Sequence, residues 1–322
     1  MSSRSATYTG ISREGAPLHS DVAQGPEDWA GWWLMCEDGV RIRVGVHGGG
    51  DKGTVLIFPG RTEYIEKYGP FAADLAAAGF SSLTIDWRGQ GLADRALENR
   101  NIGHIDDFKD YQKDLRAVKA ALSELDLPKP YFLLGHSMGG CIGLRSLMEG
   151  LDVKAVTFSA PMWDISLSPL RKSAGWAVSH LARQIGLKGT LAPGTLDTPY
   201  AMINAFEDNM LTTDPEMYGF MRAQLTAYPD LSLGGPSMAW LNEALIECRT
   251  LSQRPTPKVP ALTLLGTAER IVDVKAVHER MARWSNGTLQ MVEGAEHEVL
   301  MEIPSRRKAA TRDTIAHFAA HR

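Results

Sequence analysis

The chain has 322 residues, a formal net charge of −4 at pH 7, 44% hydrophobic residues and 22% charged residues. This composition provides enough apolar material for a large core and excludes a disordered or fibrous chain. No run of basic residues offers a face to a phosphate backbone, so we expect no nucleic acid partner. The length exceeds that of one ordinary domain but is too short for two enzymes. It therefore predicts one large core with an additional segment.

Cysteine usage and the N-terminal segment indicate the compartment. Cys36, Cys141 and Cys248 are too few and too widely spaced for a disulfide framework or a zinc site, so we expect them to be reduced and mostly buried. Residues 1–20 contain no apolar stretch typical of a signal peptide, and no apolar run is long enough to span a membrane. Nor is an amphipathic basic helix evident. We therefore expect a cytoplasmic protein without stable membrane insertion, of unknown oligomeric state.

In the first half of the chain, strand patterns alternate with helix patterns. Residues 39–47 alternate apolar and other side chains and predict a strand that opens the sheet in an antiparallel pair. Turn residues follow at 48–51, and the apolar run 54–58 predicts a buried strand. Further strands are predicted at 82–86, 131–134 and 153–158, and helices at 68–78, 106–125 and 139–149. This alternation predicts a mostly parallel sheet of the α/β class, flanked by helices.

The alternation stops at Pro161 and resumes at Ala261. Strands at 261–265 and 289–292 and helices at 274–284 and 305–320 then complete the core. Residues 162–257 differ in kind, because they hold six of the thirteen methionines, helical stretches at 216–228 and 236–251, and no clear strand pattern. We interpret residues 162–257 as an inserted helical cap, and residues 1–161 with 258–322 as the catalytic core.

A Gly-x-Ser-x-Gly sequence at 135–139 lies directly between the predicted strand 131–134 and the helix that starts at 139. In such a strand-turn-helix the serine occupies a tight, strained turn, and the flanking glycines let the strand and helix approach. This context predicts Ser137 as a nucleophile rather than a structural turn residue. Alternation around the turn points His136 away from the hydroxyl, which suggests a packing or hydrogen-bonding role.

A serine nucleophile needs a base and an acid, and in this arrangement they follow it in the order acid, then histidine. His297 follows a predicted strand and is the predicted base, whereas His278, His317 and His321 fall in predicted helices.

The loop after strand 261–265 offers two carboxylates for the acid. We favour Glu269, which is nearest the strand end. Asp273 stands where it can cap the next helix, and Asp164 is a third candidate.

An oxyanion hole requires two backbone donors. The predicted donors are the N–H of Met138, which follows the nucleophile, and the N–H of Arg61, in the loop after strand 54–58. For the Arg61 side chain the plain alternative is an exposed arginine paired with Glu63.

Four stretches in this order resemble the lysophospholipase and monoacylglycerol lipase-like group of α/β-hydrolases. They are residues 59–64 (PGRTEY) with Lys67 and Tyr68, residues 86–91 (DWRGQG), residues 135–140 (GHSMGG) and residues 293–297 (EGAEH). Pro59 replaces the histidine usual in the group, and Glu269 stands where the group usually has aspartate.

The resemblance implies an α/β-hydrolase fold and hydrolysis of fatty acyl esters, small-molecule substrates, through an acyl-enzyme. It also implies that no metal or organic cofactor is needed. In this scheme His297 takes the proton of Ser137, Glu269 orients the imidazole, and Met138 with Arg61 binds the oxyanion.

The insertion has the position of the cap in such lipases, where substrate choice is made. Its flexible apolar side chains could line a substrate pocket or form the cap's own small core. The candidates for substrate contact are Met162, Trp163, Met202 and Met210, followed by Trp176, Met217, Met221 and Trp240.

Two other functions stay open. A proline iminopeptidase-type aminopeptidase would need cap carboxylates such as Glu207 and Asp208 to bind a free amino terminus. A non-catalytic binding member of the fold is disfavoured, because all three triad positions are filled.

Overall fold

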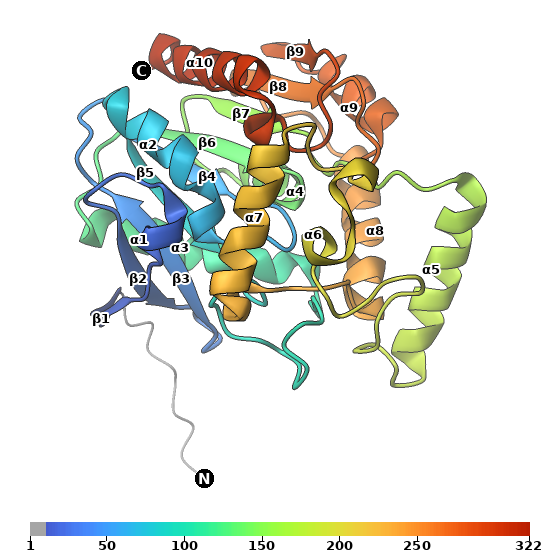
Figure 1. Cartoon of the computed structure of the whole chain (residues 1–322). Helices are drawn as coiled ribbons and strands as arrows, with labels where there is room; N and C mark the ends of the chain where they lie inside the picture. The colour runs from blue at the N-terminus through green and yellow to red at the C-terminus, as the bar shows by residue number, and fades with distance from the viewer. Residues whose placement is uncertain (1–10) are drawn as a thin grey trace.

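A nine-stranded sheet forms the centre of the molecule (Figure 1). The computed structural model describes residues 11–322, so the first half of the segment in which we found no signal peptide lies outside the described residues. The strand order is β1-β2-β3-β5-β4-β6-β7-β8-β9. The strands are β1 (Ile11–Ala16), β2 (Ala30–Met35), β3 (Arg41–His47), β4 (Thr54–Phe58), β5 (Ser81–Asp86), β6 (Tyr131–His136), β7 (Val156–Ser159), β8 (Ala261–Gly266) and β9 (Gly287–Val292).

The sheet is mostly parallel, as the alternation predicts. Strands β5, β4, β6, β7, β8 and β9 are paired in parallel, while β1, β2 and β3 are antiparallel to their neighbours. Strand β3 pairs with β2 and β5 rather than with β4. The sequence patterns missed β1 and β2. Strand β2 carries Trp32, Trp33 and Leu34 in succession, so its burial follows no simple alternation.

Helices cover both faces of the sheet because side chains alternate along each strand. Val55 and Ile57 of β4 pack in one cluster with Phe71 and Phe318, whereas Leu56 and Phe58 belong to the larger cluster on the other face. The core helices are α1 (Ser20–Ala23), η1 (Ile65–Tyr68), α2 (Gly69–Ala77), η2 (Phe108–Asp110), α3 (Tyr111–Glu124), α4 (Met138–Met148), α9 (Val274–Met281), η5 (Val299–Met301) and α10 (Pro304–Ala320). Helix α3 starts later than predicted because Asp107 caps the 3-10 turn η2 before it.

Every element between β7 and β8 in the described chain is helical. These elements are α5 (Pro169–Gln184), α6 (Tyr200–Ile203), η3 (Phe206–Asp208), α7 (Pro215–Ala227), η4 (Pro229–Leu231) and α8 (Met238–Ser252). Asp214 and Ser237 cap α7 and α8 through the N–H groups of Glu216 and Trp240. Trp240 and Cys248 of α8 pack in the same cluster as the sheet, so the cap shares part of its core with the catalytic unit.

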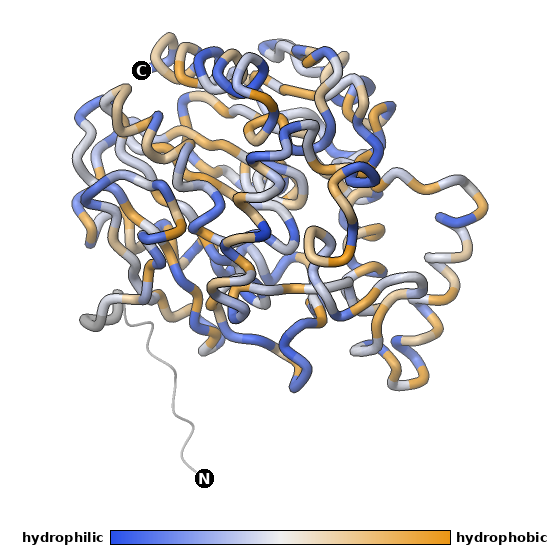
Figure 2. Tube along the Cα trace, in the orientation of Figure 1, coloured by the Kyte–Doolittle hydropathy of each residue, from blue (hydrophilic) through white to orange (hydrophobic). Residues whose placement is uncertain are grey.

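Helix α5 lies at the edge of the cap, furthest from the sheet (Figure 1), and corrects one expectation from the sequence. It presents apolar side chains to solvent. Leu170, which precedes the basic Arg171 and Lys172, is 81% exposed, and Leu181 is 58% exposed. Figure 2 shows apolar residues along this helix. An amphipathic basic helix is therefore present, although every helix in residues 11–322 is too short or too polar to span a bilayer.

The turn between β6 and α4 is packed as closely as a backbone allows. A Cβ atom added to Gly139 would lie 1.9 Å from the Phe58 carbonyl oxygen. A Cβ atom on Gly140 would lie 2.6 Å from Cβ of Pro161. Gly139 lets the start of α4 approach the end of β4, as the sequence motif predicts, and Gly140 lets the same helix approach Pro161.

We predict that Gly139→Ala destabilises the protein by about 2 kcal/mol or more, because the new methyl group meets backbone rather than a movable side chain. The matched control is Gly219→Ala in α7, where an added Cβ meets nothing within 4 Å. That substitution should stabilise the helix by about 0.5–1 kcal/mol. Urea unfolding of both variants measures the difference, and equal effects would contradict the close-packing argument.

Candidate active site

A cavity of about 300 Å³ lies at the edge of the sheet where β4, β6 and β8 end, underneath the cap. Ser137, His297 and Arg61 line it from the core. Most of its other walls are apolar side chains from the cap and from the loops near it, including Met162, Met210, Leu211, Met221, Leu225 and Trp240. The cavity therefore joins polar groups from the ends of the strands to an apolar wall.

Ser137 sits in a strained backbone conformation, with φ 49° and ψ −117°, at the N-cap position of α4. Positive φ is unfavourable for a residue with a Cβ atom, so the surrounding packing must hold it. Part of that hold is the Ser137 N–H, which donates to the Ser159 carbonyl at 3.0 Å. The serine is thereby fixed facing the cavity at the start of a helix.

His297 and Glu269 form a buried pair, and His297 lines the same cavity as Ser137. Nδ1 of His297 lies 2.7 Å from Oε2 of Glu269. Oε1 of Glu269 accepts the N–H groups of Ile271 and Val272 at 2.6 and 3.0 Å. Burial by itself raises the pKa of Glu269, but His297 and these two N–H groups outweigh it and lower the pKa. An ionised Glu269 can only accept, so Nδ1 of His297 carries a proton and Nε2 stays available as a base.

The other carboxylates considered for this role are engaged elsewhere. Asp273 accepts the Ala276 N–H at 3.1 Å and caps α9. Asp164 bonds the Ile165 N–H and forms an ion pair with Lys172. His278 is exposed on α9, and His317 and His321 lie half-buried at the end of α10, outside the lining of the cavity. Among these candidates the geometry brings only Glu269 and His297 together.

The two predicted oxyanion donors belong to segments that adjoin Ser137. Met138 is the first residue of α4, and an N–H at that position has no acceptor within the helix. The Arg61 N–H donates to no acceptor in residues 11–322. Arg61 follows Gly60, where an added Cβ would lie 3.0 Å from Cβ of Ser137. The oxyanion hole stays a prediction that this arrangement favours.

The Arg61 side chain does not pair with Glu63, which corrects the plain alternative. Nη1 of Arg61 donates to the Gly234 carbonyl at 2.8 Å, and the guanidinium lies 5.4 Å from the centre of the Trp240 ring. Glu63 turns instead to the Gly60 N–H, to Lys67 and to the hydroxyl of Tyr68. Arg61 thus enters the cavity without a carboxylate.

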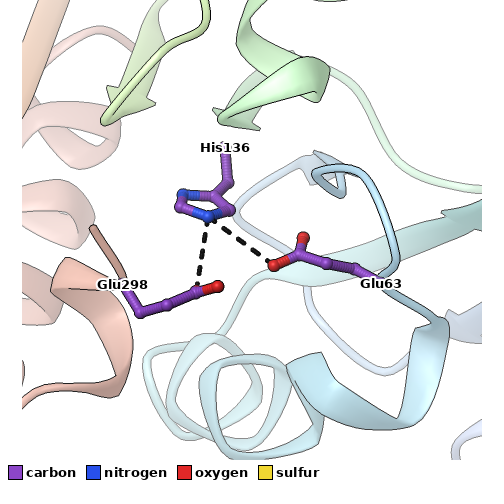
Figure 3. A group of neighbouring side chains, drawn as sticks. All are labelled: Glu63, His136 and Glu298. Carbon is purple, nitrogen blue, oxygen red and sulfur yellow. Dashed lines mark ion pairs between the residues drawn. The ribbon is translucent and has the colours of Figure 1, made fainter. Parts of the chain in front are cut away.

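Four buried ionisable residues, Glu63, Lys67, His136 and Glu298, form a charge cluster behind the serine (Figure 3 shows three of them). Lys67 donates to Glu63 and, at 2.6 Å, to Oε1 of Glu298. Nε2 of His136 lies 3.3 Å from Glu298 and 3.6 Å from Glu63, contacts that are ion pairs when the imidazole is protonated and that lack hydrogen-bond geometry. Nδ1 of His136 faces the Ser159 carbonyl at 3.0 Å.

The charges in this cluster shift one another's pKa values. Burial lowers the pKa of His136, but the two glutamates outweigh it and raise the pKa overall. Burial opposes ionisation of Glu298, yet Lys67 and His136 hold its pKa well below the ordinary value. Glu63, His136 and Glu298 have ligand atoms within 4.8 Å of one another, as in a metal site. Since the Lys67 ammonium already bonds both carboxylates, the cluster contains its own cation.

The charge cluster joins three segments that carry the predicted catalytic groups. Glu63 holds the Gly60 N–H in the loop after β4, His136 precedes Ser137, and Glu298 follows His297. Sequence reasoning missed Glu298 and assigned no role to Lys67, which belongs to the first family motif and stands four residues after Glu63.

The cap also contacts the loop of the base directly. The N–H of Glu298 donates to the Leu211 carbonyl at 2.7 Å, and the N–H of His297 faces the Met210 carbonyl at 3.4 Å. The Thr212 hydroxyl donates to the Met301 carbonyl at 2.7 Å. A cap segment, residues 209–213, is thus bonded along the backbone of residues 297–301.

The predicted substrate contacts divide into two groups. Met162 and Met210 line the cavity, as do Met221 and Trp240. Trp163 does not line it, because it packs between Phe158 and Trp284 in the core. Met202 does not line it either, and packs against the small cluster around Leu225 and Leu231. The sequence shows that such residues are apolar but not which of them point inward.

Comparisons with known proteins agree with this geometry. A family profile described as serine aminopeptidase, S33, matches residues 49–304. Lysophospholipase L2 of Escherichia coli (strain K12) is 30% identical over 284 residues, covering 83% of this chain and 80% of that protein. The monoglyceride lipase of Mus musculus is 25% identical over 261 residues, covering 80% of this chain and 78% of that protein.

Solved structures share the architecture. A soluble variant of the monoglyceride lipase of Saccharomyces cerevisiae, in complex with a substrate analog, superposes with a TM-score of 0.68 at 18% identity, covering 99% of this chain and 97% of that one. A thermostable carboxyl esterase of Bacillus coagulans gives a TM-score of 0.73 at 14% identity, covering 92% and 99%. At these identities the likeness concerns the fold.

We predict that Glu269→Gln lowers kcat about a thousandfold or more, because the amide can present its NH2 group to His297 and favour the wrong tautomer. Asp273→Asn is the matched control on the same loop. It should leave kcat within about threefold and cost at most about 1 kcal/mol of stability through a weakened helix cap. Steady-state rates on an acyl ester measure both, and a full rate for Glu269→Gln would move the acid to another residue.

We predict that Glu298→Gln destabilises the protein by about 2–4 kcal/mol at neutral pH, because it removes a buried partner of Lys67 and His136. The folded-state pKa of Glu298 lies below its ordinary value of 4.5, so its stabilising effect is complete above that pH and is lost as the pH falls. The difference between variant and wild type should therefore shrink below about pH 4.5.

Glu296→Gln is the control for the charge cluster, since Glu296 lies on the same loop as Glu298 but pairs with the exposed Arg270 of the loop after β8. Its effect should stay within about 0.5 kcal/mol at every pH. Unfolding by urea across a pH series gives both curves, and parallel curves for Glu298→Gln and wild type would refute the assigned ionisation.

Proposed function

This chain belongs to the serine aminopeptidase S33 family of α/β-hydrolases, and on that premise we propose that it hydrolyses carboxylic esters of fatty acyl groups through Ser137, His297 and Glu269. The family resemblance and the fold expected from the sequence motifs are thereby confirmed. The observation that carries the proposal is that Ser137, on its strained turn, and His297, which is paired with the buried Glu269, line one largely apolar cavity.

The proposed reaction begins with attack of Ser137 Oγ on the ester carbonyl while Nε2 of His297 takes the hydroxyl proton. The N–H groups of Met138 and Arg61 donate to the oxyanion that forms, and Glu269 stabilises the imidazolium without taking its proton. Collapse breaks the bond to the alcohol oxygen, which leaves with the proton from His297.

The acyl-enzyme is then hydrolysed by the same groups. Water adds to the acyl carbon and gives a proton to His297, and the second tetrahedral intermediate releases the carboxylic acid as that proton returns to Ser137. Overall, one ester and one water give one acid and one alcohol. Every proton transferred in the cycle comes from a residue of this chain, the substrate or water.

The cavity wall supports an acyl substrate. Met162, Met210 and Met221 line it, and methionine adapts its shape to flexible apolar ligands. Two relatives in the comparisons are a lysophospholipase and a monoglyceride lipase, which supports a lipid ester as the substrate of this chain.

The aminopeptidase alternative has the family description in its favour but lacks a binding group for an amino terminus. Glu207 and Asp208 are exposed and lie outside the cavity lining. The carboxylates of Glu63 and Glu298 do line the cavity, but Lys67 already bonds both. An ester substrate is therefore the better fit.

A fluorophosphonate probe should label the wild-type protein at Ser137 and leave Ser137→Ala unlabelled. The same preparation should cleave acyl esters and show at least about tenfold lower kcat/KM on an amino-terminal proline amide. Rates on both substrates test the proposal. Absence of labelling would falsify the serine hydrolase mechanism, and preference for the amide would replace the esterase by the peptidase.

A further inference from the structure

Arg61 is a cation in the cavity that no carboxylate neutralises. Among residues 11–322 its side chain forms no ion pair, and its bonds are those of Nη1 to the Gly234 carbonyl and of the guanidinium to the Trp240 ring. Nε and Nη2 donate to no described atom, yet they are not among the buried polar atoms left without a partner. These two donors therefore keep access to the cavity.

The other permanent cation of the cavity differs. Lys67 is neutralised by Glu63 and Glu298 of the charge cluster. Glu63 is the carboxylate nearest to Arg61 in the sequence, but it faces His136 (Figure 3) and Lys67. Glu63 is thus an acid in the same loop as Arg61, but its carboxylate pairs with other residues.

A half-buried cation without a counter-ion is costly, and its surroundings shift its pKa. Burial lowers the pKa of Arg61 to about 10, which still leaves the side chain charged at neutral pH. A guanidinium with two free, adjacent donors matches the oxygens of a phosphate or carboxylate in a bidentate geometry. An anionic ligand would therefore supply the missing counter-ion.

The position of Arg61 indicates which part of a substrate would carry that anion. Its backbone N–H is a predicted oxyanion donor, and the preceding Gly60 packs against Ser137. The ester carbonyl and the anion would thus bind to the two ends of one residue, separated by about the length of an arginine side chain. In a lysophospholipid a glycerol unit places the phosphate at such a distance from the ester.

We propose that the Arg61 guanidinium binds the phosphodiester of a lysophospholipid whose acyl ester lies at Ser137, and so selects phosphate-bearing acyl esters over neutral glycerides. This inference rests on the proposed ester hydrolysis. The competing role is purely structural, in which Arg61 only fastens the loop after β4 to the cap through Gly234.

The experiment compares a lysophosphatidylcholine with the monoacylglycerol of the same decanoyl chain. Arg61→Met keeps the backbone N–H but removes the guanidinium. The ratio of kcat/KM for the phospholipid to that for the glyceride should fall about tenfold or more, mainly through KM of the phospholipid. Arg61→Lys keeps the charge without the fork, so its ratio should fall less.

Arg95 provides the matched control, because it too is a half-buried arginine without an ion pair in the described chain. Burial lowers its pKa to about 10, and its Nη2 donates to the Gly91 carbonyl at 2.7 Å. Its Nε and Nη1 are sealed from solvent, and it lies outside the cavity lining. Arg95→Met should therefore leave the substrate ratio unchanged even where it lowers stability.

The outcomes separate the inference from the function beneath it. If the wild type cleaves neither substrate, the proposed function fails. If it cleaves both and Arg61→Met reduces both rates by the same factor, the inference fails and the esterase stands. Fluorophosphonate labelling of each variant shows that the site is formed. If Arg61→Met does not fold, inhibition of the wild type is measured instead. Glycerophosphocholine should inhibit far more than glycerol at the same concentration, and equal inhibition would overturn the inference.

Discussion

The site depends on one steric constraint, the close approach of the start of α4 to the end of β4. Gly139 can have no Cβ atom because the Phe58 carbonyl occupies that position, and Ser137, two residues before it, has a positive φ. A serine in this conformation faces the cavity while the helix start directs its N–H groups toward the same space. The strain is local, and it is sustained by the packing of a large parallel sheet.

Charge organises the second layer of the site. The turn between β6 and α4, the loop after β4 and the loop after β9 come from distant parts of the chain. Lys67 bonds Glu63 in the loop after β4 and Glu298 in the loop after β9, next to His297. Such buried ion pairs add little net stability. They favour one arrangement of the loops, because a displaced loop leaves a buried charge unpaired. The cluster therefore acts more on the relative position of the loops than on the free energy of unfolding.

Sequence patterns predicted what local physics determines. Apolar runs predicted strands β3 to β9, and glycine spacing predicted the turn between β6 and α4. Chain order predicted the pair of Glu269 and His297, whose side chains are in contact in the structure. Strand β2 escaped because it is buried irregularly. Glu298 escaped because its partners lie far away in sequence, and Trp163 and Met202 were misplaced because composition does not indicate the direction of a side chain.

The backbone bonds between residues 209–213 and 297–301 bear on how this protein can diversify. Because the cap carbonyls of Met210 and Leu211 accept the N–H groups of the loop that carries His297, a new cap must reproduce that backbone path or His297 moves. Changes of substrate range in this lineage should then arise by substitution of single side chains in the cavity wall. Exchange of a whole cap would displace the loop that carries His297 as well as the cavity wall, so the two would change together.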